Sequence, residues 1–419
     1  MEYIKRDIEN TVRETAHTFK ALLLTGSRQV GKSTLLEHLF GDIRRITFDD
    51  PVLLAQAKQE PQLFIDDNKP PVLFDEIQYA ASLFPYIKMV CDKSKQKGLY
   101  YLTGSQQFHM MKNVSETLAG RVGILELSPL SLREIQKVDF RGHFLPTEEY
   151  LEKREKSAKP YGDIWEVVHR GGYPELQDPD VPWERFFGSY LKTYIERDIN
   201  QLEKVKDQLK FTQFLTAIAA RTAGMLNYQN VADQLEISLN TVKNWISLLE
   251  ATGLIFILQP FTHSALNRAI KTPKLYFRDT GLVCYLTKWS TPETAKNGAM
   301  AGSIFETFAV SEILKSFSNE GHDYRMHVTY YRGKDKVKKR KNGEEVRTDS
   351  EIDLIIEENG ICYPIEIKMT ANPKAEMTAA FEVLDKIPEA KRGAGGIVCL
   401  YDRPLTLREN VRAIPVNYL

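Results

Sequence analysis

Two glycines, a lysine and a serine stand at a spacing that suits phosphate binding. The segment GSRQVGKS, residues 26–33, fits the pattern G-x-x-x-x-G-K-[ST] and follows an apolar run. The glycines permit backbone conformations that direct consecutive N–H groups at phosphate oxygens, while Lys32 reaches the β/γ-phosphates and Ser33 presents a hydroxyl to Mg²⁺. We therefore expect a loop that binds ATP with Mg²⁺. Its residues are Gly26, Ser27, Arg28, Gln29, Val30, Gly31, Lys32, Ser33 and Thr34.

Two adjacent carboxylates follow a second apolar run, in PPVLFDEIQ at residues 70–78. At the carboxyl end of a parallel strand, Asp75 can hold Mg²⁺ through its water shell. Glu76 can then polarise the water that attacks the γ-phosphate. The pair predicts nucleotide hydrolysis as well as nucleotide binding.

A third set of reactive side chains lies in EIDLIIEENGICYPIEIK, residues 351–368. The Asn-Gly dipeptide at 359–360 predicts a two-residue hairpin turn, which places Asp353 directly opposite Glu366 and Lys368 on the same face. Opposed carboxylates repel unless a cation lies between them, so this face is a candidate metal site. The other face is expected to be buried and carries Ile352, Leu354, Ile356, Tyr363, Ile365 and Ile367.

The order D…E-x-K on a hairpin, preceded by a helical segment (301–317) that bears Glu306, resembles the PD-(D/E)XK nuclease superfamily. The resemblance implies that Glu306, Asp353 and Glu366 ligate a metal ion and that Lys368 is catalytic. Ile352 stands where this superfamily usually has proline. Glu306 has a second interpretation, a capping box with Ser303. Seven basic residues between 332 and 341 are either a solvated loop or a contact to nucleic-acid phosphates.

Further apolar runs at 43–48, 99–105 and 123–127 alternate with helical patterns, which indicates a parallel sheet with helices on both faces. GSRQVGKST, LFDEIQ, YLTGSQ and LAGRVGILELSPLSLREI together resemble bacterial and archaeal AAA-type P-loop ATPases with a nuclease-like C-terminal half. This resemblance implies that Ser105 is a sensor of the γ-phosphate or the attacking water. It also implies that Arg121 is an arginine finger, which would act between copies of the chain. The alternative for Arg121 is a cation that stabilises a helix C-terminus.

The middle of the chain has two parts. Residues 139–163 are polar and predict a linker or an exposed helical segment. RGGYPE at 170–175 and YLKTYIERDI at 190–199 resemble segments of the same ATPase family, which implies a small helical lid. LNYQNVADQLEISLNTVKNWISLLEATGLIFILQPF, residues 226–261, has the pattern of a helix-turn-helix with a wing. Asn240, Lys243 and Asn244 would face DNA, but a single lysine offers little charge to a phosphate backbone, and a packing role for this unit stays open.

The predicted fold is α/β, with a P-loop NTPase sheet, a helical lid and a winged helix, followed by an α+β restriction-endonuclease-like domain. The expected domains are a P-loop ATPase core at 1–138, a linker and lid at 139–205, a winged-helix-like unit at 206–262 and a PD-(D/E)XK nuclease-like domain at 263–419.

Composition excludes some functional classes. The 56 basic and 56 acidic side chains cancel, so attraction to nucleic acid must be local. No apolar run approaches the roughly 20 residues that span a bilayer. We expect a cytoplasmic protein, with DNA and a second copy of the chain as candidate partners. It is either an ATP-driven enzyme that binds and cuts DNA, or a nucleotide-dependent switch whose nuclease-like domain only docks a protein.

Overall fold

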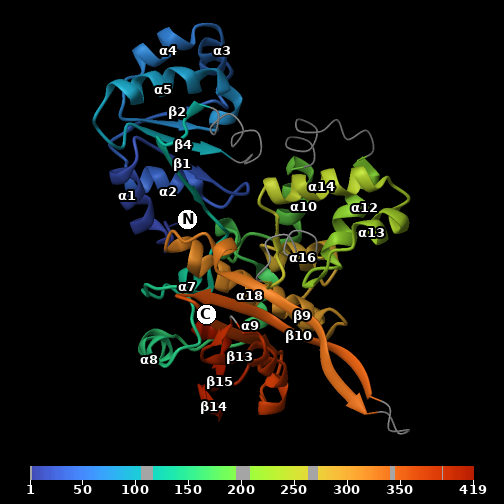
Figure 1. Cartoon of the computed structure of the whole chain (residues 1–419). Helices are drawn as coiled ribbons and strands as arrows, with labels where there is room; N and C mark the ends of the chain where they lie inside the picture. Colours follow the sequence, from blue (N-terminus) through green and yellow to red (C-terminus); the bar gives the residue numbers. More distant parts are fainter. Residues whose placement is uncertain (1, 105–116, 195–207, 263–271, 340–344, 389) are drawn as a thin grey trace.

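The computed structural model describes residues 2–104, 117–194, 208–262, 272–339, 345–388 and 390–419 (Figure 1). The side chains of residues 334–349 lie outside this description. None of the helices in these ranges combines the length and the apolar character needed to cross a bilayer.

The N-terminal unit is a parallel sheet with helices on both faces, in the strand order β2-β3-β4-β1-β5. Alternate residues of β1 enter different cores, Leu22 with one set of helices and Leu23 with the other. The predicted architecture of this unit is therefore confirmed. The strands are β1 Ala21–Thr25, β2 Arg44–Thr47, β3 Val72–Asp75, β4 Tyr100–Gly104 and β5 Val122–Glu126. The helices are α1 Glu9–Thr18, α2 Lys32–Leu39, α3 Pro51–Gln59, α4 Pro61–Asp67, η1 Ile77–Leu83 and α5 Phe84–Lys93.

The segment at 139–163, predicted as a linker or an exposed helical segment, contains helix α8, one side of which packs against the last residues of the chain. Helix α8 buries Arg154, whose guanidinium donates to the backbone carbonyls of Tyr418 at 2.9 Å and Asn417 at 2.9 Å. A long cationic side chain can be buried in this way when carbonyl oxygens accept its hydrogen bonds. The elements of this region are α7 Leu132–Ile135, α8 Glu148–Ser157, α9 Ile164–Arg170, η2 Pro174–Gln177 and α10 Trp183–Tyr194.

Three helices and a small antiparallel sheet of order β6-β8-β7 follow. Strand β8 lies beyond residue 262, so this unit borrows a strand from the region assigned to the C-terminal domain. Its elements are α12 Gln208–Ala219, β6 Gly224–Met225, α13 Tyr228–Leu235, α14 Leu239–Ala251, β7 Ile255–Leu258 and β8 Lys274–Phe277.

The C-terminal unit is a mixed sheet of order β14-β15-β13-β11-β10-β9, with helix α18 packed against it (Figure 1). Its helices are α16 Thr280–Leu286, α17 Pro292–Asn297, α18 Ala301–Asn319, η4 Tyr324–Met326, η5 Ala375–Lys386 and η6 Val416–Tyr418. Its strands are β9 Val328–Lys339, β10 Glu345–Glu358, β11 Ile361–Ile367, β12 Lys391–Arg392, β13 Gly395–Cys399, β14 Leu405–Arg408 and β15 Val411–Pro415.

The predicted hairpin register is confirmed, because Glu358 pairs with Ile361 and Leu354 with Ile365. The apolar residues predicted to be buried are buried, except for the half-buried Tyr363, but they do not all lie on one face. A register irregularity against β9, between Ile352 and Ile355, brings both of these side chains into a cluster with η5, whereas Leu354 joins the core under α18. Both faces are therefore covered in this part of the strand, and Asp353, between Ile352 and Leu354, is buried.

Candidate functional site

The loop between β1 and α2 has the backbone that its glycines predict. Gly26 has φ +141°, and a Cβ atom there would lie 2.2 Å from the carbonyl oxygen of Leu127. Gly31 has φ +93° and precedes α2. The ammonium of Lys32 donates to the carbonyl oxygens of Gly26 at 3.0 Å and Ser27 at 2.8 Å. The lysine is thus folded over its own loop, beside the N-terminus of α2.

Asp75, at the end of β3, lies beside this loop. Its carboxylate accepts hydrogen bonds from Ser33 Oγ at 2.6 Å, from Thr103 Oγ1 and from Arg45 at 2.6 Å. Burial raises the pKa of Asp75, but the hydrogen bonds from Ser33, Thr103 and Arg45 outweigh it and hold the pKa below its usual value. Asp75 is therefore an ionised oxygen donor next to a serine hydroxyl, and these two groups suit Mg²⁺.

Glu76 follows in a left-handed conformation, with φ 57°. Its N–H donates to Thr103 Oγ1 at 3.1 Å, and the amide of Gln78 donates to its carboxylate. Together with the loop residues, Glu76 lines a cavity of 290 Å³ that Tyr190 and Thr193 of α10 also line. The helical segment predicted as a lid thus contributes side chains to the candidate nucleotide site.

Of the other two predicted ATPase residues, the structure places only Arg121. Ser105 lies outside the described residues. Arg121 precedes β5, and its carbonyl accepts from the N–H groups of Lys20 and Ala21, so it lies at the opposite end of the sheet from the phosphate-binding loop. Its guanidinium pairs with Asp92 and donates to Ala119 O at 2.7 Å. Within one chain Arg121 cannot contact the nucleotide, and a role between copies stays a prediction.

A second polar cluster forms where α18, β8, β10 and β11 meet. Lys368 Nζ lies 2.6 Å from Glu366 Oε1 and 3.4 Å from Asp353 Oδ2, and the backbone N–H of Ile367 donates to the same Asp353 oxygen at 2.8 Å. Glu306 Oε1 accepts from Tyr276 OH at 2.8 Å. The structure therefore gathers all four residues of the predicted nuclease-like set into one network.

Sequence reasoning missed two members of this network, Lys274 and Tyr276, and gave Glu351 no role in it. Lys274 and Tyr276 of β8 both bind Glu306, and Lys274 also lies 2.5 Å from Glu351 Oε1. The available signal was a lysine and a tyrosine two residues apart in KLYF, which places both on one face of a strand.

The electrostatics of the cluster are those of crowded, buried acids. Burial, and then repulsion from Asp353, raise the pKa of Glu306 to about 7 and that of Glu366 to about 8. One carboxylate oxygen of Glu366, Oε2, is buried and has no hydrogen-bond partner among the described residues. The donor set has the oxygen chemistry that Mg²⁺ and Mn²⁺ prefer. However, in the described part of the chain no three or more His, Cys, Asp or Glu side chains are arranged to hold a metal ion.

The predicted DNA-facing residues Asn240, Lys243 and Asn244 of α14 are exposed. The C-terminal end of the same helix approaches the nucleotide site, because a Cβ atom on Gly253 would lie 3.1 Å from the backbone nitrogen of Ser27. The three-helix unit therefore contacts the phosphate-binding loop.

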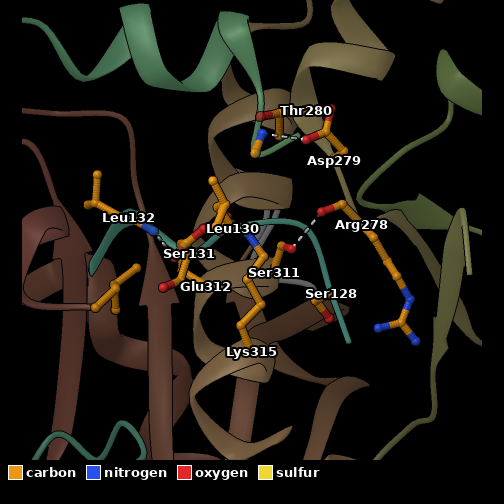
Figure 2. Close-up of polar contacts among 12 residues, drawn as sticks. Ser128, Leu130, Ser131, Leu132, Arg278, Asp279, Thr280, Ser311, Glu312 and Lys315 are labelled. Atoms are coloured by element: carbon orange, nitrogen blue, oxygen red, sulfur yellow. Dashed lines mark hydrogen bonds and ion pairs between the residues drawn. The ribbon is translucent and has the colours of Figure 1, made fainter. Parts of the chain in front are cut away.

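Buried polar contacts join the ATPase core to the C-terminal unit (Figure 2). Glu312 of α18 accepts from the backbone N–H of Leu132 at 2.8 Å, and Lys315 donates to Leu130 O at 2.9 Å and to Glu312 Oε1 at 2.7 Å. Arg278, directly after β8, pairs with Glu126 at the end of β5 at 2.9 Å. These contacts hold α18 and β8 against the edge of the ATPase sheet.

Comparison with known proteins gives three domain matches. Residues 18–136 match an AAA domain, residues 161–293 a domain of unknown function (DUF8612) and residues 301–419 another domain of unknown function (DUF4143). The AAA match covers the phosphate-binding loop, Asp75 and Glu76. Together with the parallel sheet, it supports an AAA-type P-loop ATPase that binds and hydrolyses ATP. Neither of the other matches carries a function, so the nuclease-like and winged-helix interpretations stay predictions.

Relatives and solved structures were also found. The chain is 24% identical over 388 residues to uncharacterized proteins of Mycobacterium tuberculosis and Mycobacterium bovis, covering 91% of this chain and 77% of theirs. A Walker-type ATPase of Pyrococcus abyssi is 17% identical, with a TM-score of 0.40, covering 68% of this chain and 96% of that one. DnaA from Aquifex aeolicus bound to AMPPCP is 13% identical, with a TM-score of 0.29, covering 58% of this chain and 85% of that one.

Proposed function

We propose that the protein is a Mg²⁺-dependent ATPase whose nucleotide state is transmitted to a C-terminal domain that acts on nucleic acid. The observation that carries the ATPase part is the 2.6 Å hydrogen bond between Ser33 and Asp75, beside the lysine-containing loop and its cavity. Ser33 and Asp75 would hold Mg²⁺, which neutralises charge on the phosphates. Lys32 would leave the carbonyls of its own loop to bind the β/γ-phosphates.

Glu76 is the proposed catalytic base or water-positioning group. Its carboxylate lines the cavity next to Ser33, and Gln78 and Thr103 fix its side chain and backbone. Hydrolysis needs a carboxylate that orients water in line with the γ-phosphate. The position of Glu76, one residue after the proposed Mg²⁺ ligand Asp75, supports that role.

Transmission to the rest of the chain has a physical basis. Tyr190 and Thr193 of α10 share the cavity with the loop, and Gly253 packs on the backbone of Ser27. A γ-phosphate in this cavity would therefore contact or displace the lid and the winged-helix-like unit. Because Glu126 pairs with Arg278, the same displacement would reach β8 and the C-terminal sheet.

For the C-terminal domain we propose metal-dependent binding or cleavage of DNA, with Glu306, Asp353 and Glu366 as metal ligands. Lys368 would orient the attacking water or stabilise charge on the phosphate. Support comes from the gathering of these four residues into one buried network. The exposed side chains of α14 and the basic run at 332–341 would contact the phosphate backbone.

A second candidate function is a nucleotide-dependent switch whose C-terminal domain docks a protein and cuts nothing. The observation that favours it is the presence of two lysine ammonium groups, Lys274 and Lys368, among the carboxylates. A purely structural cluster of buried acids requires neutralising charge, and these two cations supply it without a metal ion.

ATP binding and turnover separate the roles in the nucleotide site. Lys32→Ala should abolish ATP binding, whereas Glu76→Gln should keep binding and stop turnover, because only Glu76 positions the water. Fluorescent-nucleotide binding and phosphate release measure the two steps. Glu60→Gln, an exposed acid of the same domain, is the matched control. Normal turnover by Glu76→Gln would reject the assignment of the base.

The coupling to nucleic acid has its own measurement. The ATPase rate of the full chain is determined with and without single- and double-stranded DNA, at several salt concentrations. Stimulation that falls steeply with salt supports the nucleic-acid function. Two results together would reject the nucleic-acid function and leave the nucleotide-dependent switch. They are an ATPase rate that neither DNA changes and the absence of any metal-dependent DNA cutting that Asp353→Asn abolishes.

A further inference from the structure

Lys274 is the most enclosed cation of the acidic cluster. Its side chain is 3% exposed, and its Nζ lies 3.1 Å from Glu306 Oε1, 2.5 Å from Glu351 Oε1 and 3.9 Å from Asp353 Oδ1. It also stands over the ring of Tyr330, 5.7 Å from the centroid. An ammonium group in such a setting stabilises three acids at once.

Lys368 serves the other side of the same cluster. It binds Glu366 Oε1 and Asp353 Oδ2, so the two oxygens of Asp353 face different lysines. Nevertheless, Glu366 Oε2 has no hydrogen-bond partner among the described residues. The side chain is 9% exposed, so this oxygen is also shielded from water. An unpartnered carboxylate oxygen in a buried acidic cluster is a free acceptor that a further cationic ligand could satisfy.

A divalent ion and the ammonium group of Lys274 need the same oxygens. Mg²⁺ takes oxygen ligands at about 2.0–2.1 Å, and Mn²⁺ also prefers oxygen ligands. An ion shared by Glu306 and Asp353 would therefore lie where Lys274 Nζ now contacts both acids, and the two positive charges would repel. This competition also accounts for carboxylates that are gathered but not arranged around a metal ion.

We infer that Lys274 is the internal cation of this cluster and must withdraw before a divalent metal ion binds to Glu306, Asp353 and Glu366. The inference rests on the proposed metal site of the C-terminal domain and adds its control element. Lys274 is a positioning residue of this site, because it determines whether a metal ion can bind to the three acids and has no proposed contact with the substrate. Since Lys274 belongs to β8, the metal site is controlled by the sheet of the three-helix unit.

The direct test is Mn²⁺ binding to the full, nucleotide-free chain, measured by electron paramagnetic resonance of free Mn²⁺. The variants are Lys274→Met, which keeps the length of the side chain and removes its charge, and Asp353→Asn, made alone and in combination with Lys274→Met. Lys315→Met is the matched control, because Lys315 is also buried and paired with one glutamate, outside the cluster.

We expect the Kd for Mn²⁺ to fall at least roughly tenfold in Lys274→Met, because one unit of opposing charge at ion-contact distance is removed. The added Asp353→Asn should abolish this site, and Lys315→Met should bind as the unmodified chain does. If Lys274→Met and the unmodified chain bind Mn²⁺ with the same Kd, and Asp353→Asn abolishes binding in both, the control role of Lys274 is overturned and the metal site is retained. No Mn²⁺ bound by any variant would overturn both.

A second measurement uses the unmodified chain, in case Lys274→Met does not fold. Labelling with an amine reagent, followed by mass spectrometry, reports how accessible Lys274 is. Saturating Mn²⁺ should raise its labelling several-fold, because the ammonium group leaves the carboxylates, while Lys315 stays unlabelled as the internal reference. Unchanged labelling of Lys274 at saturating Mn²⁺ would overturn the inference. ATPase rates with Mg²⁺, measured separately, test the ATPase proposal on their own.

Discussion

Glu312 of α18 is the carboxylate whose removal should do most harm at the contact between the ATPase core and the C-terminal unit (Figure 2). It accepts a hydrogen bond from the backbone N–H of Leu132 and pairs with Lys315, and the residues Glu312 and Lys315 are 3% and 7% exposed. Glu312→Met preserves the approximate volume and removes the charge and both acceptors. Among the described residues, the ammonium group of Lys315 would then keep its hydrogen bond to Leu130 O and the longer-range attraction of the buried Asp279.

The magnitude follows from these contacts. Removing one partner of a buried ion pair costs about 3–5 kcal/mol, because the other charge stays buried without compensation. The orphaned N–H of Leu132 adds about 1–3 kcal/mol. After relaxation we expect about 4 kcal/mol, which corresponds to a fall in the unfolding temperature of about 8–16 °C for a domain of this size.

Thermal unfolding followed by circular dichroism measures the effect. Glu312→Met combined with Lys315→Met should recover about half of the loss, because replacing both charges leaves no unpaired ion. Glu149→Met is the control, since Glu149 and its partner Lys153 are 79% and 61% exposed, and it should leave the unfolding temperature nearly unchanged. A fall of less than about 2 °C in Glu312→Met, or a double variant less stable than the single one, would refute the reasoning.

Three further outcomes are expected. If Arg121 acts between copies of the chain, Arg121→Ala should lower ATP turnover by up to roughly 10³-fold while ATP still binds, and mixing with Glu76→Gln should restore part of the rate; no rescue and a monomer at all concentrations would exclude this role. Burial lowers the pKa of His169, so the folded chain favours the neutral imidazole. The contribution of His169 to stability is therefore complete above its ordinary pKa of 6.5 and is lost as the pH falls below it. His169→Asn should flatten the loss of stability between about pH 7 and 5, whereas His17→Asn, at an exposed position, should not. Gly26→Ala should abolish ATP binding, because its Cβ would clash with a backbone carbonyl; retained binding would argue against the loop geometry.

The nucleotide site and the hairpin could be predicted because their information lies in a few consecutive residues. The glycines and the lysine of 26–33 fix a loop at the junction of one strand and one helix. The Asn-Gly pair fixes the hairpin register, and both residues have the positive φ values, 51° and 76°, of the turn that such a pair favours.

The rest could not be predicted, because it depends on contacts between distant segments. Lys274 reaches Glu306 and Glu351 only because β8 lies beside α18 and β10. Arg154 appears in a polar helix and is buried by the backbone carbonyls of the last residues of the chain. The irregular pairing of β10 with β9 puts Ile352 and Ile355 on the same side, which no alternation of residue types reveals.

Strand β8 links two sites for which we propose ligands, the acidic cluster for a divalent ion and the phosphate-binding loop for ATP. Lys274 begins the strand in the acidic cluster. Arg278, directly after its last residue, pairs with Glu126 at the end of β5, which lies beside β1, the strand that leads into the phosphate-binding loop. Thermodynamic linkage is reciprocal, so if bound ATP moves β8 and changes the affinity of the cluster for a divalent ion, that ion must change the affinity for ATP by the same factor. The cellular concentration of free divalent cations would then set how much nucleotide the protein retains, and the acidic cluster would act as an input to the ATPase as well as its output.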